Sequence, residues 1–347
     1  MPNSSKDLRV LIVRLGAMGD ILHSMPAVTA LRRAHPRWFV GWAVEPQWRG
    51  LFAAGNAQPR TAGMPLVDRL HVVPAKQWAR APLGAATWAE MRRVRREIRS
   101  MRYDLAVDMQ GAVRSALIAG WAGSGNVVGE ARPREYAARW LFDRKVATRG
   151  VHVIEQSAEL AEAVQGESLP IPLPMLPCDA AAEGEAAGIR EPFVLLSPGA
   201  GWGAKRWPAD RYGAVARRLA EAGYSVMVNT GPAEEQIVQQ VAEASGNAAR
   251  PLSLDMGRLI AYTRRAALII AGDTGPLHLA CALGRPVVAI FGPTDPARNG
   301  PFHSRSVVLR HPDSVRDHTR RSEPEAGLLT ITPESVARAA LSLLEAS

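Results

Sequence analysis

The sequence is short of cysteine, of long apolar runs and of negative charge. Its two cysteines, Cys178 and Cys281, lie far apart without metal-site spacing, so we expect both to be small buried hydrophobic residues. No stretch reaches about 18 apolar residues without a charge, which excludes a membrane-spanning helix. Lys and Arg outnumber Asp and Glu, and the net charge of +9 predicts a surface that attracts anions.

Motifs of several other protein classes are also missing. The loop at residues 16–20 has the spacing G-x-x-G-D and lacks the G-x-G-x-x-G fingerprint, which disfavours a nicotinamide-dependent dehydrogenase. No helix-turn-helix, zinc or ribonucleoprotein motif occurs, so we expect no nucleic-acid partner in spite of the basic charge. The first apolar run is broken by Arg14, unlike the core of a signal peptide, and we therefore expect a cytoplasmic protein.

The length of the chain predicts two domains. Its 347 residues exceed the size, about 250–300 residues, at which a single hydrophobic core usually stops growing. Residues 166–192 are rich in Pro, Gly and Ala and weak in periodicity, which marks the boundary. We expect an N-terminal domain of residues 1–175, a linker of 176–192 and a C-terminal domain of 193–347. The last helix, about residues 333–345, closes the second domain or packs back onto the first.

Short apolar runs alternate with helical periodicity in both halves. Before the boundary the runs lie at residues 8–15, 39–44, 67–73 and 105–109, and after it at 193–197, 224–229, 268–271 and 286–291. This alternation predicts an α/β protein built from two doubly wound parallel-sheet domains. Ligands of such sheets bind at the carboxyl ends of the strands, so the loops that follow the strands are the candidates for chemistry.

The first candidate loop, residues 16–20, ends in Asp20. Its carboxylate either caps the following helix or stays in the loop above the sheet. The second interpretation requires Ser24 to cap the helix and Pro26 to lie in its first turn, because a proline inside a helix costs about 3 kcal/mol. A carboxylate left in the loop could accept a proton from a hydroxyl group.

Two further candidate loops lie in the second half. Residues 197–208 combine four small residues with Lys205 ahead of a helix that Pro208 would open, which suits a phosphate or, alternatively, a plain solvated loop. Residues 271–278 place Asp273 before a helix that begins near Pro276, where free amides favour an anion. Asp273 either caps that helix or accepts hydrogen bonds from sugar hydroxyls. The three loops together predict a nucleotide-diphosphate site that faces a base.

Five segments carry a resemblance to a known family. In order along the chain they read LIVRLGAMGDILHSMPAVTALRRAHP, DMQGAVRSALIAG, KRWP, GPAEEQ and AGDTGPLHLACALGRPVVAIFGPTDP. They resemble the bacterial ADP-heptose:lipopolysaccharide heptosyltransferases of glycosyltransferase family 9, and most of all the heptosyltransferase I type. The resemblance covers nearly the whole chain. It implies a GT-B architecture, in which two Rossmann-like domains face a central cleft.

The resemblance also implies a reaction and a set of site residues. The implied reaction is the inverting transfer of L-glycero-D-manno-heptose from ADP-heptose to the Kdo region of lipid A, with Asp20 as general base. The implied donor-binding residues are Lys205, Glu235, Asp273, Thr274, Gly275 and His278. Related members often have Thr residues where this chain has Ala200 and Gly201. No D-x-D pair occurs, so we expect neither an obligatory metal nor a cofactor.

Basic residues mark the expected acceptor side. Four arginines spaced i, i+3, i+4 and i+7 form one stripe of a helix: Arg92, Arg95, Arg96 and Arg99. The stripe is either a solvated face or a rim that binds lipid A–Kdo or the anionic inner leaflet. The resemblance places Arg114 and Arg134 on the acceptor side. We therefore expect the protein to sit peripherally on the cytoplasmic face of the inner membrane.

Alternative functions remain open on the sequence. The nearest is heptosyltransferase II, or another member of the family with a different sugar or acceptor. A protein of another class, which binds anions without catalysis, would also be basic, but it would not need the three loops described above.

Overall fold

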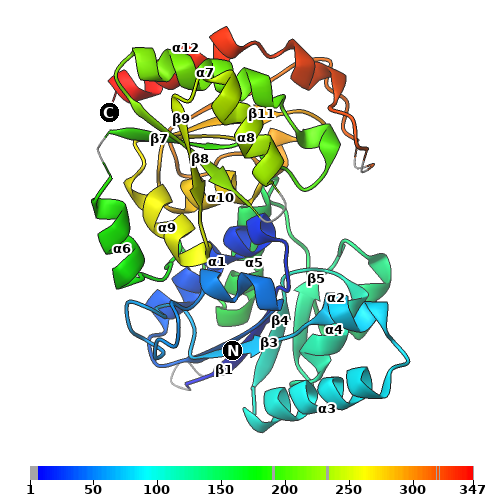
Figure 1. Ribbon diagram of the computed structural model, residues 1–347. Helices are drawn as coiled ribbons and strands as arrows, with labels where there is room; N and C mark the ends of the chain where they lie inside the picture. Colours follow the sequence, from blue (N-terminus) through cyan, green and yellow to red (C-terminus); the bar gives the residue numbers. More distant parts are fainter. Residues whose placement is uncertain (1–6, 190–191, 232–233, 318, 320, 347) are drawn as a thin grey trace. The chain divides into compact units, whose positions relative to one another are not determined.

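The computed structural model describes residues 7–189, 192–231, 234–317, 319 and 321–346. The chain divides into two compact units, Met1–Cys178 and Asp179–Ser347. Each unit is a six-stranded, wholly parallel sheet with helices on both faces (Figure 1). This arrangement confirms the α/β fold with two doubly wound parallel sheets that the sequence predicts.

The first unit has the strand order β3-β2-β1-β4-β5-β6. Its strands are β1 Arg9–Val13, β2 Phe39–Val44, β3 Arg69–Val72, β4 Leu105–Asp108, β5 Val127–Glu130 and β6 Arg144–Val146. Its helices are α1 Met18–Ala34, η1 Pro46–Leu51, α2 Ala75–Arg80, α3 Ala85–Ser100, α4 Val113–Gly120, η2 Tyr136–Leu141 and α5 Val153–Gln165. The direction of winding reverses between β1 and β4, and this switch point is where such sheets bind ligands.

The second unit repeats the same topology, with the order β12-β11-β10-β7-β8-β9. Its strands are β7 Phe193–Ser197, β8 Ser225–Thr230, β9 Ala249–Ser253, β10 Leu268–Gly272, β11 Val287–Phe291 and β12 Ser306–Arg310. Its helices are α6 Ala180–Ala187, η3 Gly203–Lys205, α7 Ala209–Glu221, α8 Glu235–Ala244, α9 Met256–Arg265, α10 Gly275–Ala282, α11 Pro296–Asn299, η4 Ala326–Thr330 and α12 Pro333–Glu345. Its switch point lies between β7 and β10.

Apolar strands form the core of each unit. The inner strands of both sheets are almost wholly buried, because helices cover both faces of each sheet. In the second unit α12 packs beside α7, and Val336 and Ala340 enter the core (Figure 1). The last helix therefore closes the second domain, which was one of the two places expected for it.

Two sequence-based expectations differ from the structure. Cys281 is buried as expected, but Cys178, the last residue of the first unit, is exposed and belongs to no core. The expected linker, residues 176–192, contains the helix α6, whose Ala182 and Ala186 are buried in the core of the second unit. Asp179 begins this helix by accepting hydrogen bonds from the amides of Ala181 and Ala182. No helix in the described ranges is long and apolar enough to cross a membrane.

Candidate functional site

The switch point of the second unit brings together the two loops that the sequence singles out. Strands β7 and β10 are parallel neighbours, with Ser197 opposite Ala271. The loop after β7 leads into η3 and the loop after β10 leads into α10. Within the first loop, Ala204 exchanges backbone hydrogen bonds with a later segment, donating to Arg321 O at 3.1 Å and accepting from Glu325 N at 3.2 Å. These bonds fix the backbone that carries Lys205.

Lys205, Asp273 and His278 form one charged cluster at this switch point. The Lys205 ammonium lies 2.5 Å from Asp273 Oδ2, and His278 Nε2 lies 3.1 Å from Asp273 Oδ1. All three side chains are largely buried. Burial acts to raise the pKa of Asp273, but the hydrogen bond from His278 and the charges of His278 and Lys205 outweigh it and hold that pKa well below its usual range.

An aromatic ring also contacts Lys205. Its ammonium lies 4.4 Å from the centroid of the Trp202 ring, which is a cation–π distance. Asp273 and Trp202 therefore hold the ammonium on two sides. A charged group fixed in this way needs little reorganisation to bind a phosphate.

The beginning of α10 is a suitable place for an anion. Thr274 is the N-cap residue, its side chain makes no capping hydrogen bond, and its hydroxyl donates instead to Gly272 O at 3.2 Å. Pro276 lies in the first turn, as the sequence predicts. The possibility that Asp273 caps this helix is wrong, because its carboxylate pairs with Lys205 and His278. Among the described residues no N-cap side chain therefore accepts the first amides of α10, and a ligand anion could take that place.

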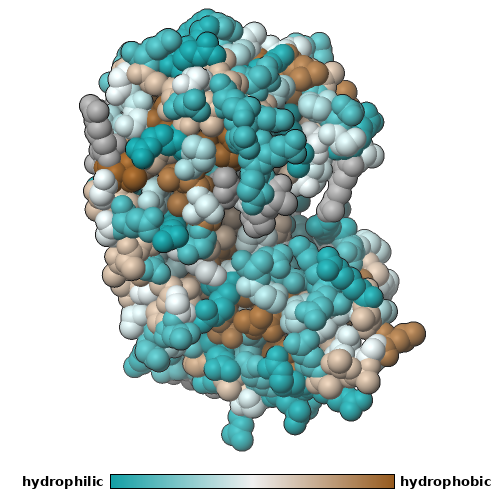
Figure 2. Space-filling model, viewed as in Figure 1, coloured by the Kyte–Doolittle hydropathy of each residue, from teal (hydrophilic) through white to brown (hydrophobic). Residues whose placement is uncertain are grey.

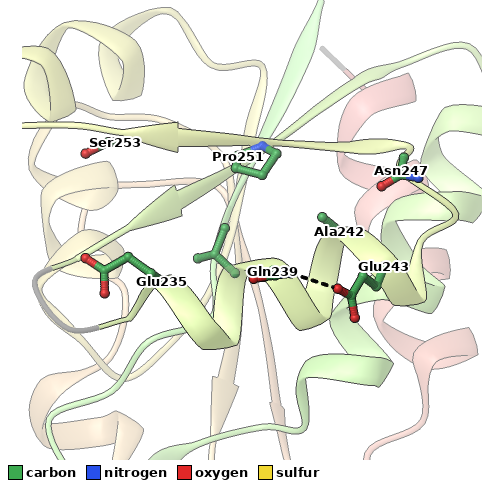
Figure 3. Close-up of a pocket in the computed structure, with 8 residues that line it drawn as sticks. Glu235, Gln239, Ala242, Glu243, Asn247, Pro251 and Ser253 are labelled. Carbon is green, nitrogen blue, oxygen red and sulfur yellow. Dashed lines mark hydrogen bonds between the residues drawn. The ribbon is translucent and has the colours of Figure 1, made fainter.

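Two neighbouring glutamates at the start of α8 occupy different places. Glu235, the residue implied by the resemblance, is exposed and lines a groove between α8 and β9, at the same end as Ser253 (Figure 3). Glu234, which the sequence analysis did not select, accepts the amide of Gly231 at 2.8 Å. A Cβ atom on Gly199 would clash with its carboxylate. Glu234 therefore lies against the glycine-rich loop, whereas Glu235 lines the groove.

Three polar atoms at the same edge of the second sheet are buried without a hydrogen-bond partner among the described residues: Ser197 Oγ, Asn229 Oδ1 and Thr294 Oγ1. They belong to the ends of β7 and β8 and to the loop after β11. An unsatisfied buried polar group costs about 1–3 kcal/mol, so such groups indicate where a polar ligand fits. None of the three was selected individually from the sequence. For Ser197 and Asn229 the available signal is a polar residue at or near the end of an apolar strand.

In the first unit, Asp20 lies in the first turn of α1 and not in the loop. Its Oδ2 accepts the amide of Ala17 at 3.1 Å, and its Oδ1 lies 3.0 Å from Arg14 Nη2. The alternative with Ser24 as N-cap is wrong, because Ser24 is buried within the helix and donates to Asp20 O at 3.1 Å. Pro26 lies in the helix interior, where extensive burial of α1 offsets its cost. The Asp20 side chain remains 40% exposed and is open to a ligand.

Residues at the end of β4 and directly after it hold the loop before α1 in place. Asp108 is buried and accepts the amides of Gln110 at 2.7 Å and Gly111 at 3.0 Å. Burial raises the pKa of Asp108 to about 6. Gln110 in turn accepts the amide of Leu15 at 2.9 Å, and Arg14 donates to the carbonyl of Met109. The two loops at this switch point are thus joined, and Arg14 is oriented toward Asp20.

The structure brings the segments of Arg114 and Arg134 together near the end of β4. Arg114 lies in the first turn of α4, and both side chains are exposed. Next to Arg134, Glu135 donates its amide to Gly111 O at 2.8 Å and accepts the amide of Val113 at 2.9 Å. Both arginines therefore lie at the same edge of the sheet as Asp20.

The arginine stripe lies elsewhere. Arg92, Arg95, Arg96 and Arg99 are exposed on α3, and none of them forms an ion pair within the described part of the chain. The helix ends at the amino edge of the sheet, where Arg9 at the start of β1 donates to Met101 O at 2.6 Å. Arg99 lies beside Gly123, which precedes β5. The stripe thus runs away from Asp20, so it does not join Arg114 and Arg134.

Removing the partner of Asp273 should destabilise the second unit. In Lys205→Met the buried carboxylate keeps only His278, and we expect a loss of about 3–5 kcal/mol in the free energy of unfolding. In Lys205→Met/Asp273→Asn no charge is left unpaired, and much of the loss should be recovered. Urea denaturation measures both, with Lys145→Met, an exposed lysine, as the control. A double variant less stable than the single one would contradict the pairing.

Similarity to known proteins identifies the family of the chain. A model of glycosyltransferase family 9 (heptosyltransferase) matches residues 91–328. The chain is 29% identical to lipopolysaccharide heptosyltransferase 1 of Pseudomonas aeruginosa over 309 residues, which are 87% of this chain and 83% of that protein. It is 25% identical to lipopolysaccharide heptosyltransferase 2 of Escherichia coli K12 over 356 residues, covering 95% and 96% of the two chains.

Solved structures give the same result. The structure titled E. coli heptosyltransferase WaaC with ADP superposes with a TM-score of 0.79 at 25% identity, and covers 97% of this chain and 100% of that one. A glycosyltransferase family 9 structure from Veillonella parvula superposes with a TM-score of 0.80 at 21% identity, covering 99% and 100%, and supports the fold alone. Because the family model spans more than half of its length, the chain belongs to glycosyltransferase family 9, the heptosyltransferase family.

Proposed function

We propose that the protein transfers L-glycero-D-manno-heptose from ADP-heptose to the Kdo region of lipid A, as an inverting and metal-independent enzyme. The observation that carries the donor assignment is the Lys205–Asp273–His278 cluster beside the beginning of α10. It offers a fixed cation and helix amides to a diphosphate. The names of the similar proteins support a heptose donor carried on ADP and a lipopolysaccharide acceptor.

The donor would be held at the carboxyl edge of the second sheet. Lys205 and the amides of Thr274 and Gly275 bind the diphosphate, because charge and helix dipole both favour an anion. Asp273 stays ionised, since its pKa is well below the usual range. Its carboxylate accepts hydrogen bonds from heptose hydroxyls, and His278 binds the heptose beside it. Glu235 faces the ribose of the adenosine. Lys205 also stabilises the negative charge that develops on departing ADP.

Transfer is a single displacement in which Asp20 is the base. Arg14 and the amide of Ala17 orient its carboxylate. Asp20 takes the proton of the acceptor hydroxyl as that oxygen bonds to the anomeric carbon, and the bond from this carbon to the phosphate oxygen breaks. One displacement inverts the configuration at the anomeric carbon. Asp20 takes the proton, and Lys205 and the amides of α10 stabilise the negative charge on departing ADP. The scheme therefore includes no metal ion.

Acceptor recognition would use the basic residues of the first unit. Arg114 and Arg134 lie at the same edge as Asp20 and suit the phosphates and carboxylates of Kdo–lipid A. The arginines of α3, Arg92, Arg95, Arg96 and Arg99, lie away from that edge and would contact the anionic inner leaflet. The enzyme would then work peripherally on the cytoplasmic face of the inner membrane.

Mass spectrometry tests the reaction directly. Incubation with ADP-heptose and Kdo₂-lipid A in excess EDTA should add the mass of one heptose to the acceptor. A gain that requires added magnesium would overturn metal independence. A gain only on an acceptor that already carries one heptose would assign the protein to the heptosyltransferase II reaction, in line with its similarity to those enzymes.

Two substitutions separate the base from the helix cap at Asp20. In Asp20→Asn the amide oxygen can still accept the Ala17 N–H, whereas in Asp20→Ala it cannot, and neither residue can take a proton. We expect both variants to lose about 10²–10⁴-fold in the rate of transfer, with ADP affinity unchanged. Single-turnover kinetics and ADP titration measure these quantities. An Asn variant with wild-type rates would leave Asp20 with a capping role only.

A further inference from the structure

Exposed apolar side chains gather on one face of the first unit. Of the eleven large hydrophobic residues exposed in the described ranges, six belong to α3, α4, η2 and the turn between α2 and α3: Leu83, Trp88, Leu117, Tyr136, Trp140 and Leu141. These elements cover the same side of the sheet, because their buried side chains share one core, which includes Trp78, Val94, Ala116 and Ala138. We call this surface the helical face.

The most exposed aromatic side chains of this face are held by an arginine. Trp140 and Tyr136 are 75% and 61% exposed. The guanidinium of Arg139 lies 4.8 Å from the Tyr136 ring centroid and 5.5 Å from that of Trp140, and it donates a hydrogen bond to the Tyr136 hydroxyl. Two rings are thus kept pointing outward around a cation. Exposed apolar side chains that gather in this way mark a site of interaction with a partner.

The charge around these rings is strongly positive. Residues 131–149 contain Arg132, Arg134, Arg139, Arg144, Lys145 and Arg149 against two acids, Glu135 and Asp143. Both carboxylates accept a hydrogen bond from a backbone amide, Glu135 from Val113 N at 2.9 Å and Asp143 from Val127 N at 2.8 Å. The six basic residues outnumber the two acids, so the segment has an excess of positive charge and favours an anionic partner.

A lipid surface fits this combination better than a nucleic acid or a protein. Trp and Tyr prefer the boundary between headgroups and acyl chains, and Arg and Lys bind anionic headgroups. Aliphatic side chains such as Leu83, which is 90% exposed, enter an apolar phase but stack on no base. Apolar side chains protrude over the turn between α2 and α3 at the lower right of Figure 2. Stable binding takes an apolar and an electrostatic contribution, and the helical face has both.

We propose that the helical face, with η2 at its centre, docks on an anionic lipid leaflet. The face adjoins the edge that carries Arg114 and Arg134, since η2 follows Arg134 and Glu135 binds Val113 at the start of α4. A lipid-anchored acceptor in the same leaflet would then present its sugars at the edge where Asp20 lies. This last step rests on the proposed function, and the docking refines the leaflet contact proposed there by naming the surface that makes it.

Vesicle sedimentation tests the docking. Wild type and Tyr136→Ser/Trp140→Ser are mixed with phosphatidylcholine vesicles with and without phosphatidylglycerol. We expect wild type to prefer the anionic vesicles. The double variant should bind them at least about tenfold more weakly, because two large apolar side chains are no longer transferred from water into the lipid. The matched control is Val151→Ser/Leu173→Ser, which removes exposed apolar side chains of the same unit outside the face. The control should bind like wild type.

Two further measurements distinguish a loss of docking from unfolding and from a loss of transfer activity. Circular dichroism should be unchanged in both variants, because the substituted side chains are exposed. Transfer to a deacylated, water-soluble Kdo acceptor should also be unchanged. Wild-type vesicle binding by the Tyr136/Trp140 variant, or equal binding of wild type to neutral and anionic vesicles, would overturn the docking proposal. Absence of soluble transfer by wild type with the expected vesicle binding would overturn the proposed function alone.

Discussion

The buried pairing of Lys205 with Asp273 is the interaction on which the proposed donor site depends. It joins the loop after β7 to the loop after β10, and so it exists only because these two parallel strands are neighbours. His278, one turn into α10, occupies the other carboxylate oxygen and links the pair to the helix that offers its amides. A cation, a carboxylate and a helix terminus are thereby fixed before any ligand arrives, which is the condition for electrostatic stabilisation of a leaving group.

The first unit has the same topology and carries a different charged pair. Its switch point lies between β1 and β4, and the pairing there is Arg14 with Asp20. The loop after β4 holds Arg14 through the carbonyl of Met109, and the buried Asp108 shapes that loop. In both units, then, a charged pair stands above the two central strands. The second is largely buried and suits the binding of charge, whereas the first leaves Asp20 accessible and suits proton transfer.

The sequence was sufficient to predict the two sheets and the three loops, because an apolar run followed by glycines is a local pattern. It was insufficient where several distant residues decide the outcome. Asp20 lies inside α1 because the free energy gained by burying the whole helix exceeds the cost of Pro26 in its interior. A local sequence pattern does not compare these two free energies. Glu234 and Asn229 were missed because their role depends on packing against other strands. The edge strand β6 is short, lacks an apolar run and left no signal.

Calorimetric titration of ADP tests the central role of the Lys205 pair most directly. The account predicts that Lys205→Met, at a temperature where it remains folded, binds ADP at least about tenfold more weakly than wild type, and that the affinity of Lys145→Met is unchanged. It also predicts that added salt weakens ADP binding less in Lys205→Met than in wild type, since a charge contact is lost. Equal ADP affinity of Lys205→Met and wild type would contradict the account, because the diphosphate would then be held without the cluster.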